Sequence, residues 1–155
     1  MNPEIMREAI RLSVETMREG RGGPFGAVIV RRKEVIGRGF NQVTSTNDPT
    51  AHAEVVAIRE ACRKLGTYRL DGCDLYTSCE PCPMCLSAIY WARIGRVYYA
   101  NTRKDAAEAG FDDELIYREL SLPLPERRLQ LEQGLRDEAL AALVEWKTKA
   151  DKTPY

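Results

Sequence analysis

Residues 51–100 read AHAEVVAIRE ACRKLGTYRL DGCDLYTSCE PCPMCLSAIY WARIGRVYYA, and this stretch decides the fold. Apolar residues recur at spacings of three and four over about 50–65 and again over 83–93, which predicts two helices. Short apolar runs at 74–78 and 96–100 predict a strand after each helix. A helix that connects neighbouring strands favours parallel pairing, so the stretch predicts an α/β fold.

The flanking sequence adds further helices and strands to this centre. It predicts a helix over 3–19, strands over 25–30 and 34–40, a polar loop over 41–50, a short helix over 112–120, a fifth strand over 129–131 and a final helix over 135–149. This order is typical of one mixed sheet with helices on both faces. We therefore expect an α/β fold around a central mixed five-stranded sheet. No linker or repeat is visible, so residues 1–155 are expected to form a single domain.

The composition argues against several broad classes of protein. Lys plus Arg and Asp plus Glu both total 23, and this neutrality disfavours nucleic acid as a partner, which usually demands a basic excess. No run of 18 apolar residues predicts a membrane span, and the N-terminal residues do not resemble a signal peptide. In such a chain the five cysteines favour metal binding or redox chemistry over disulfides, and the expected location is cytoplasmic.

Two short motifs supply the residues of a zinc site. The single histidine, His52, lies in Pro49-Thr-Ala-His-Ala-Glu54, and Cys82 and Cys85 lie in Pro81-Cys-Pro-Met-Cys85. Each motif falls at a predicted helix start, where backbone N–H groups favour thiolates. Three protein ligands leave a coordination position for water, which distinguishes a catalytic zinc from a structural one. We expect one zinc per chain.

Glu54 is the residue that predicts chemistry at this zinc. It lies two positions after His52, and residues at that spacing do not share a helix face. Its carboxylate would therefore approach a zinc-activated water from another side than His52, which suits a general acid and base. The alternative is that Glu54 only complements the helix dipole.

Three other readings of the motifs stay open at this point. Cys79 could add a fourth ligand and close a structural zinc site. The Cys82-x-x-Cys85 pair could be redox-active, although this would leave His52 and Glu54 without a role. His52 and the cysteines could also be ordinary unligated residues.

The motifs resemble those of a known family. His-x-Glu followed by Pro-Cys-x-x-Cys is the signature of zinc nucleobase deaminases, and the chain looks like a member of the cytidine deaminase-like superfamily. Four segments together resemble the small bacterial guanine deaminases: 23–28 (GPFGAV), 47–54 (NDPTAHAE), 76–85 (YTSCEPCPMC) and 105–113 (DAAEAGFDD). The last segment discriminates best, since the first three are shared in part with tRNA adenosine deaminases and cytosine deaminases.

The resemblance implies a fold and a set of roles. It implies a three-layer α/β/α fold, with one zinc held by the residues named above and Glu54 as the main proton carrier. Asn41 would bind the purine, and Asp113 would be a second carboxylate in contact with it. The family forms domain-swapped homodimers, so the segment from about 121 to Tyr155 would close the partner's active site. The alternatives are that Asp112 caps a helix while Asp113 is solvated, and that Tyr155 is a frayed terminus.

Two aromatic residues complete the expected site. Phe25 and Trp91 could stack on a base, although core positions in a strand and a helix explain them equally well.

The expected activity is zinc-dependent hydrolysis of guanine to xanthine and ammonia. Water would attack C2, and Glu54 would protonate N3. The competing functions are a tRNA adenosine deaminase, a cytosine-type deaminase and a non-catalytic zinc module. Against tRNA, residues 126–152 mix acidic and basic side chains in equal number.

Overall fold

The computed structural model describes residues 1–154, whose contacts divide the chain into two compact units, Met1–Leu115 and Ile116–Tyr155. The elements of the first unit are α1 (Pro3–Arg18), β1 (Gly26–Arg31), β2 (Glu34–Phe40), α2 (Val43–Thr46), α3 (Ala53–Leu65), β3 (Cys73–Cys79), α4 (Pro83–Trp91), β4 (Arg96–Asn101) and α5 (Arg103–Glu108). Helix α6 (Glu114–Ser121) begins at the end of the first unit and continues into the second. The second unit also contains a 3-10 turn at Leu124–Glu126 and α7 (Arg136–Thr148). None of the helices over residues 1–154 has the length and apolar content needed to span a bilayer.

The first unit is built on a mixed four-stranded sheet in the order β2-β1-β3-β4. Strand β1 runs antiparallel to β2 and β3, while β3 and β4 are parallel. The parallel pairing predicted across residues 51–100 is therefore confirmed. It follows from α4, which carries the chain from the end of β3 back to the start of β4.

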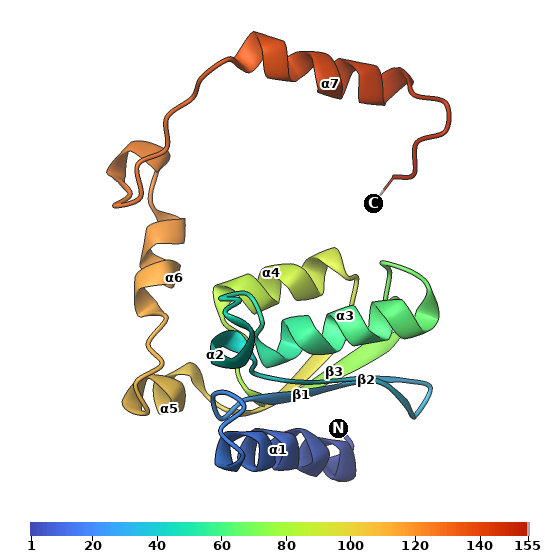
Figure 1. Cartoon of the computed structure of the whole chain (residues 1–155), viewed down its shortest axis with the longest axis vertical. Coiled ribbons are helices and arrows are strands. Elements are labelled where there is room, and N and C mark those ends of the chain that lie inside the picture. The colour runs from blue at the N-terminus through green and yellow to red at the C-terminus, as the bar shows by residue number, and fades with distance from the viewer. Residues whose placement is uncertain (155) are drawn as a thin grey trace. The chain divides into compact units, whose positions relative to one another are not determined.

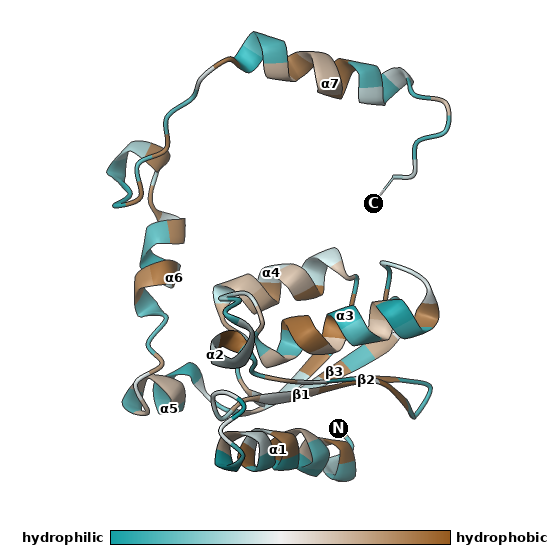
Figure 2. Ribbon diagram, viewed as in Figure 1, coloured by the Kyte–Doolittle hydropathy of each residue, from teal (hydrophilic) through white to brown (hydrophobic). Residues whose placement is uncertain are grey.

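Helices cover both faces of this sheet (Figure 1). Alternate residues of β1 point to opposite faces: Ala27 and Ile29 pack in a cluster with α3 and α4, and Val28 and Val30 pack with α1. Gly39 of β2 lets α3 lie very close, since a Cβ there would come within 2.0 Å of the Ala53 carbonyl oxygen. Figure 2 shows α1 and α3 striped with hydrophobic and hydrophilic residues, as helices on a sheet surface require. The expected three-layer α/β/α arrangement is present within the first unit.

The prediction of a fifth strand over 129–131 is wrong for the described chain. A strand requires a neighbour that satisfies its backbone hydrogen bonds, and the second unit contains no strand over residues 116–154. Leu129 and Leu131 are instead exposed. The sheet of the first unit therefore ends at β4.

Two short helices were not predicted. Helix α2 lies within the expected polar loop, and α5 follows β4 directly. The signal for α5 was present in the sequence: Thr102 and Asp105 form a capping box, in which the Thr102 side chain accepts from the Asp105 N–H and the Asp105 carboxylate accepts from the Thr102 N–H.

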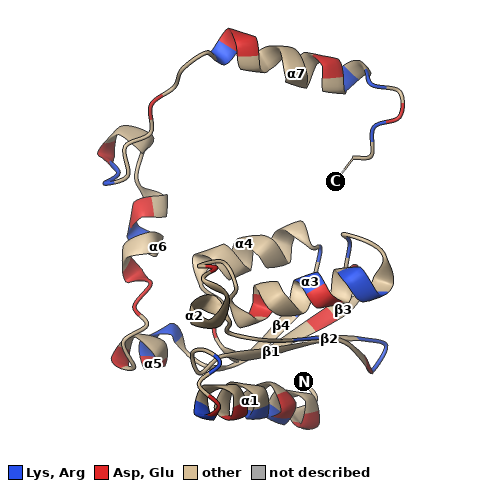
Figure 3. Cartoon of the chain, in the orientation of Figure 1, with Lys and Arg blue, Asp and Glu red and all other residues tan. Residues whose placement is uncertain are grey.

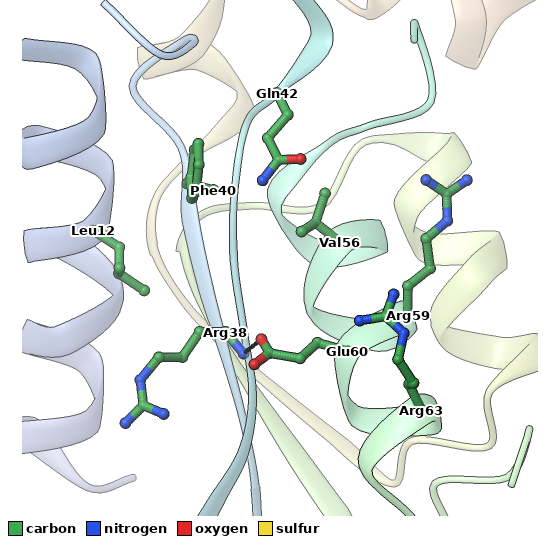
Figure 4. A pocket seen from close by; sticks show the side chains of 8 residues that line it. All are labelled: Leu12, Arg38, Phe40, Gln42, Val56, Arg59, Glu60 and Arg63. Carbon is green, nitrogen blue, oxygen red and sulfur yellow. Dashed lines mark hydrogen bonds between the residues drawn. The ribbon is translucent and has the colours of Figure 1, made fainter. Parts of the chain in front are cut away.

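Side chains of α3 cover the outer edge of β2 (Figure 4). The Glu60 carboxylate accepts a hydrogen bond of 2.6 Å from the Arg38 N–H, and one turn later Lys64 Nζ donates to the Val35 carbonyl at 3.1 Å. A groove of about 520 Å³ follows this edge, lined by Leu12, Arg38, Phe40, Gln42, Val56, Arg59, Glu60 and Arg63. None of these lining residues belongs to the predicted zinc site.

Candidate metal centre and active site

The starts of α3 and α4 bring the two sequence motifs together. The helices lie side by side on one face of the sheet (Figure 1). His52 is the N-cap of α3 and Cys82 is the N-cap of α4, both with extended backbone angles, and Cys85 lies in the first turn of α4. Ligand atoms of His52, Cys82 and Cys85 all lie within 4.8 Å of one another. The predicted convergence of these three residues is therefore found in the structure.

Local sequence explains why both helices begin where they do. Asp48 accepts hydrogen bonds from the N–H and hydroxyl of Thr50, at 2.8 and 2.6 Å. This turn keeps Thr50 out of the helix, so α3 starts at Ala53 rather than at the expected residue 50. Pro83 occupies the first position of α4, where its fixed φ and missing N–H are compatible with a helix.

The chemistry of the donor set fits zinc. Cys82 Sγ lies 3.5 Å from His52 Nδ1. A hydrogen bond from the Cys85 thiol, together with one from His52, lowers the pKa of Cys82 to about 4. The same Cys82 contact and burial raise the pKa of Cys85. Zinc binding releases thiol protons because thiolates are the ligands, and two thiolates with one imidazole are a known catalytic set.

Cys79 stands apart from this group. Its thiol donates to the Thr102 carbonyl at 3.6 Å, and burial raises its pKa to about 11. It is therefore a protonated thiol that ties the end of β3 to the start of α5. The described residues that could hold a metal form a group of three without Cys79, which disfavours the closed four-ligand site.

Glu54 lies beside the three ligands but outside their group. It is only 6% exposed in the first turn of α3, and its Oε1 accepts a hydrogen bond of 3.0 Å from Thr77 Oγ1. Burial is the largest effect on the pKa of Glu54 and raises it. Hydrogen bonds from its own N–H, Thr77 and Cys85 lower this pKa but do not cancel the effect of burial. A carboxylate held at such a position is suited to take up a proton and pass it on.

Asn41 is fixed with its amide group in one orientation. It is buried just after β2, and its Oδ1 accepts hydrogen bonds from the N–H groups of Gly23 (3.3 Å) and Val43 (3.2 Å). Gly22 makes this close approach possible, since a Cβ there would lie 1.7 Å from the Asn41 carbonyl oxygen. Because Oδ1 is engaged by two donors, the side chain presents its NH₂ group, which can only donate.

The segment after α5 carries one aromatic residue and two aspartates. Phe111 packs edge-on against Phe25, with ring centroids 4.9 Å apart and an interplanar angle of 86°. Asp112 Oδ1 accepts from the Glu114 N–H at 2.9 Å and so caps α6. Burial, and next the charge of Cys82, raise the pKa of Asp113. The two neighbouring aspartates thus have different surroundings.

The structure does not bring Trp91 to this group within the chain. Trp91 ends α4 and is 63% exposed, and at about 1.5 Å per residue it lies about 13 Å along the helix from Cys82. Pro83, Cys85 and Ile89 are the buried residues of that helix, and the exposed Trp91 is not among them. Tyr155 lies outside the described residues.

Thr77 and Phe111 are site neighbours that sequence reasoning missed. Thr77 sits inside an apolar strand, and nothing local indicates that its hydroxyl meets a residue 23 positions earlier. A weak signal for Phe111 was available, since an aromatic residue next to two aspartates is unusual for a solvated turn.

Comparison with known proteins identifies the class. Residues 2–101 match the model of the cytidine and deoxycytidylate deaminase zinc-binding region. The chain therefore belongs to this family of zinc-binding deaminases.

Within the family, the chain is similar over its full length to guanine deaminase of Bacillus subtilis (strain 168), with 54% identity and complete coverage of both sequences. The X-ray structure of guanine deaminase from Bacillus subtilis matches with a TM-score of 0.97 and 53% identity, covering 100% of this chain and 99% of that one. The tRNA-specific adenosine deaminase of Aquifex aeolicus is 43% identical over 62% of this chain and 63% of its own length.

Proposed function

We propose that this protein hydrolyses guanine to xanthine and ammonia, a step of purine breakdown. The observation that carries the proposal is the buried carboxylate of Glu54. It lies beside His52, Cys82 and Cys85, the group that could hold a metal, but is not part of that group. The full-length similarity to the Bacillus subtilis enzyme supports guanine as the substrate.

His52, Cys82 and Cys85 would hold one zinc per chain. When bound there, zinc supplies a water that is acidic enough to act as a nucleophile at neutral pH. The protein's own contribution is to hold the ligands at two helix starts and to exclude competing donors such as Cys79.

Glu54 moves the protons of the reaction. Water adds to C2 of guanine, the carbon that bears the amine. Glu54 takes a proton from this water and delivers it to N3, so that the ring accepts the nucleophile without gaining a charge. The remaining proton of the added water, on the new C2 hydroxyl, is transferred to the amine. The C2–N bond then breaks as the C2 carbonyl forms, which gives ammonia and xanthine. Asp113, whose pKa is raised by burial and next by the charge of Cys82, is the second carboxylate that assists the amine as it leaves.

Asn41 and Phe25 bind the purine in this proposal. The NH₂ group of Asn41 donates to an acceptor atom of the ring system, and guanine offers O6 and N7 as acceptors. Phe25 contributes an apolar ring that Phe111 holds in place.

Replacing Asn41 with aspartate tests whether this side chain donates a hydrogen bond to the purine. The Asp side chain keeps an oxygen for the N–H groups of Gly23 and Val43, but it puts an acceptor where the donor was. We expect KM for guanine to rise about 10- to 100-fold, because two acceptors then face each other. Steady-state kinetics measure this, with thermal unfolding as the check on folding. An unchanged KM in a folded variant would rule out contact between this amide and the purine.

A substrate panel tests the proposed function itself. Ammonia release is measured with guanine, adenine, cytosine, their nucleosides and a tRNA anticodon stem. We expect turnover of free guanine. Turnover of the anticodon stem or cytosine without turnover of guanine would instead assign the site to one of the two competing deaminase activities.

We also propose that the protein is a homodimer in which residues 121–155 of each chain complete the partner's site. Helix α4 carries no charged residue (Figure 3), and its Leu86, Tyr90 and Trp91 are exposed. Exposed apolar surface of this kind favours association. Strand β4 lies at one edge of the four-stranded sheet. Leu129 and Leu131 add further exposed apolar surface.

Mixing two impaired variants tests the exchange of segments. Glu54→Gln removes the proton carrier, and Tyr155→Ala removes the terminal side chain expected in the partner's site. If the sites are shared, a mixed dimer holds one site with an intact Glu54 and an intact partner Tyr155. We expect co-refolding of the two to restore activity well above that of either alone. Mere averaging of their activities would show that each chain completes its own site.

A further inference from the structure

Thr77 contacts Glu54 through a hydrogen bond that has no part in the reaction as described so far. Its Oγ1 lies 3.0 Å from Glu54 Oε1, and Thr77 itself is 1% exposed. An ionised carboxylate can only accept hydrogen bonds, so the hydroxyl is the donor in this pair. Hydrogen bonds to a charged acceptor are about twice as strong as those between neutral groups.

The position of Thr77 is rigid. It lies in β3, an inner strand, where it pairs with Ala27 of β1 on one side and Tyr99 of β4 on the other. Its β-branched side chain has few rotamers available. Leu75 of the same strand packs in the cluster below α3, so Thr77, two residues on, faces the same helix. The hydroxyl therefore cannot follow Glu54 if that side chain moves, and it fixes the carboxylate instead.

This contact makes the two carboxylate oxygens inequivalent. While Oε1 accepts the Thr77 hydrogen, a proton taken up by Glu54 is favoured on Oε2. We propose that Thr77 is a positioning residue, an inference that rests on the proposed function. Its hydroxyl holds Glu54 Oε1 as an acceptor, so that Oε2 exchanges protons with water and purine. The proton passes from water to Oε2 and from Oε2 to N3, and Thr77 keeps its own hydrogen throughout.

The test compares Thr77→Val with Thr77→Ser. Valine has nearly the same shape but no hydroxyl, so Glu54 loses its fixed partner while the packing is kept. We expect kcat for guanine to fall about 10- to 100-fold, with KM within about twofold and zinc content unchanged. Serine keeps the donor, and we expect Thr77→Ser to recover most of kcat.

Ser78→Ala is the matched control for the loss of a buried hydroxyl. Ser78 is the next residue of β3, and its Oγ accepts from the Gly26 N–H at 3.0 Å without contact to Glu54. This variant is expected to lose stability but to keep kcat within about threefold. If kcat of Ser78→Ala fell as far as that of Thr77→Val, the positioning role of Thr77 would be overturned. The loss would then follow from disturbing β3 and not from the hydrogen bond to Glu54.

Infrared spectroscopy gives a readout that does not depend on turnover. The Glu54 carboxyl band is assigned from the difference between wild-type and Glu54→Gln proteins without metal. We expect Thr77→Val to shift this band and Thr77→Ser to restore it, because the band follows the hydrogen bonds of the group. Wild-type turnover of guanine tests the proposed function separately. If the wild type is active while Thr77→Val keeps both its kcat and the band, only the role of Thr77 is refuted.

Discussion

Glu54→Gln is expected to lower kcat for guanine by about 10²- to 10⁴-fold, the range that a positioned acid–base group contributes. Glutamine has the same shape, and its amide oxygen can still accept the hydrogen bond from Thr77. The amide nitrogen would take the place of the other oxygen, Oε2. It cannot accept a proton from water, so the first step of the proposed cycle is lost while the binding of the purine remains.

Zinc content is the control for this variant. Glu54 lies outside the group of His52, Cys82 and Cys85, so its replacement should leave the metal in place. Elemental analysis and kinetics on the same preparation separate the two effects. Near-normal turnover by a zinc-loaded Glu54→Gln protein would contradict the assigned role, and zinc loss would make Glu54 a ligand.

Cys85→Ala is expected to lose zinc and, with it, activity down to the background of the assay. The Cys85 side chain is fully buried and its sulfur belongs to the donor group, so no other side chain can replace it from solvent. Removing an outer-shell partner of a zinc ligand already weakens binding about 10- to 100-fold, and loss of a ligand itself should exceed this. The measurement is zinc affinity by competition with a chelator.

Cys79→Ala is the matched control for the loss of a buried cysteine. Cys79 precedes Cys85 by six residues and is also buried, but its thiol donates to the Thr102 carbonyl. We expect this variant to be less stable, by about 1 kcal/mol for the lost hydrogen bond, yet to bind zinc as the wild type does. Equal loss of zinc in both variants would mean that Cys79 is a ligand.

Sequence periodicity predicted most of the first unit, because α1 and α3 bury one face each and β1 and β3 are short, buried strands. Helix α1 and strands β1 to β4 lie within one or two residues of the expected ranges. The three metal-binding candidates could also be predicted, since each lies at or next to a helix start and local sequence sets those starts. The spacing of these residues along the sequence was therefore sufficient to single out the three candidates.

Other features depend on contacts that no local pattern records. The face of α4 could not be chosen from its sequence, because the helix is apolar all round, and Trp91 turned out to lie outward. Residues 129–131 have a strand-like composition, but a strand exists only where a neighbour accepts its hydrogen bonds. The hydroxyl of Thr77 reaches Glu54 only because β3 and α3 pack together.

The covering of β2 by Glu60 and Lys64 limits how this protein can associate. A strand edge with free N–H and C=O groups is a template on which further chains can add without end. Here Glu60 of α3 accepts from the Arg38 N–H of that edge (Figure 4), and Lys64 of α3 donates to its Val35 carbonyl. The other end of the sheet is β4. A sheet that can grow from one side only forms closed pairs rather than fibres, since the added strand leaves no second site for another copy. We therefore expect these two hydrogen bonds to disfavour the addition of a further strand at β2.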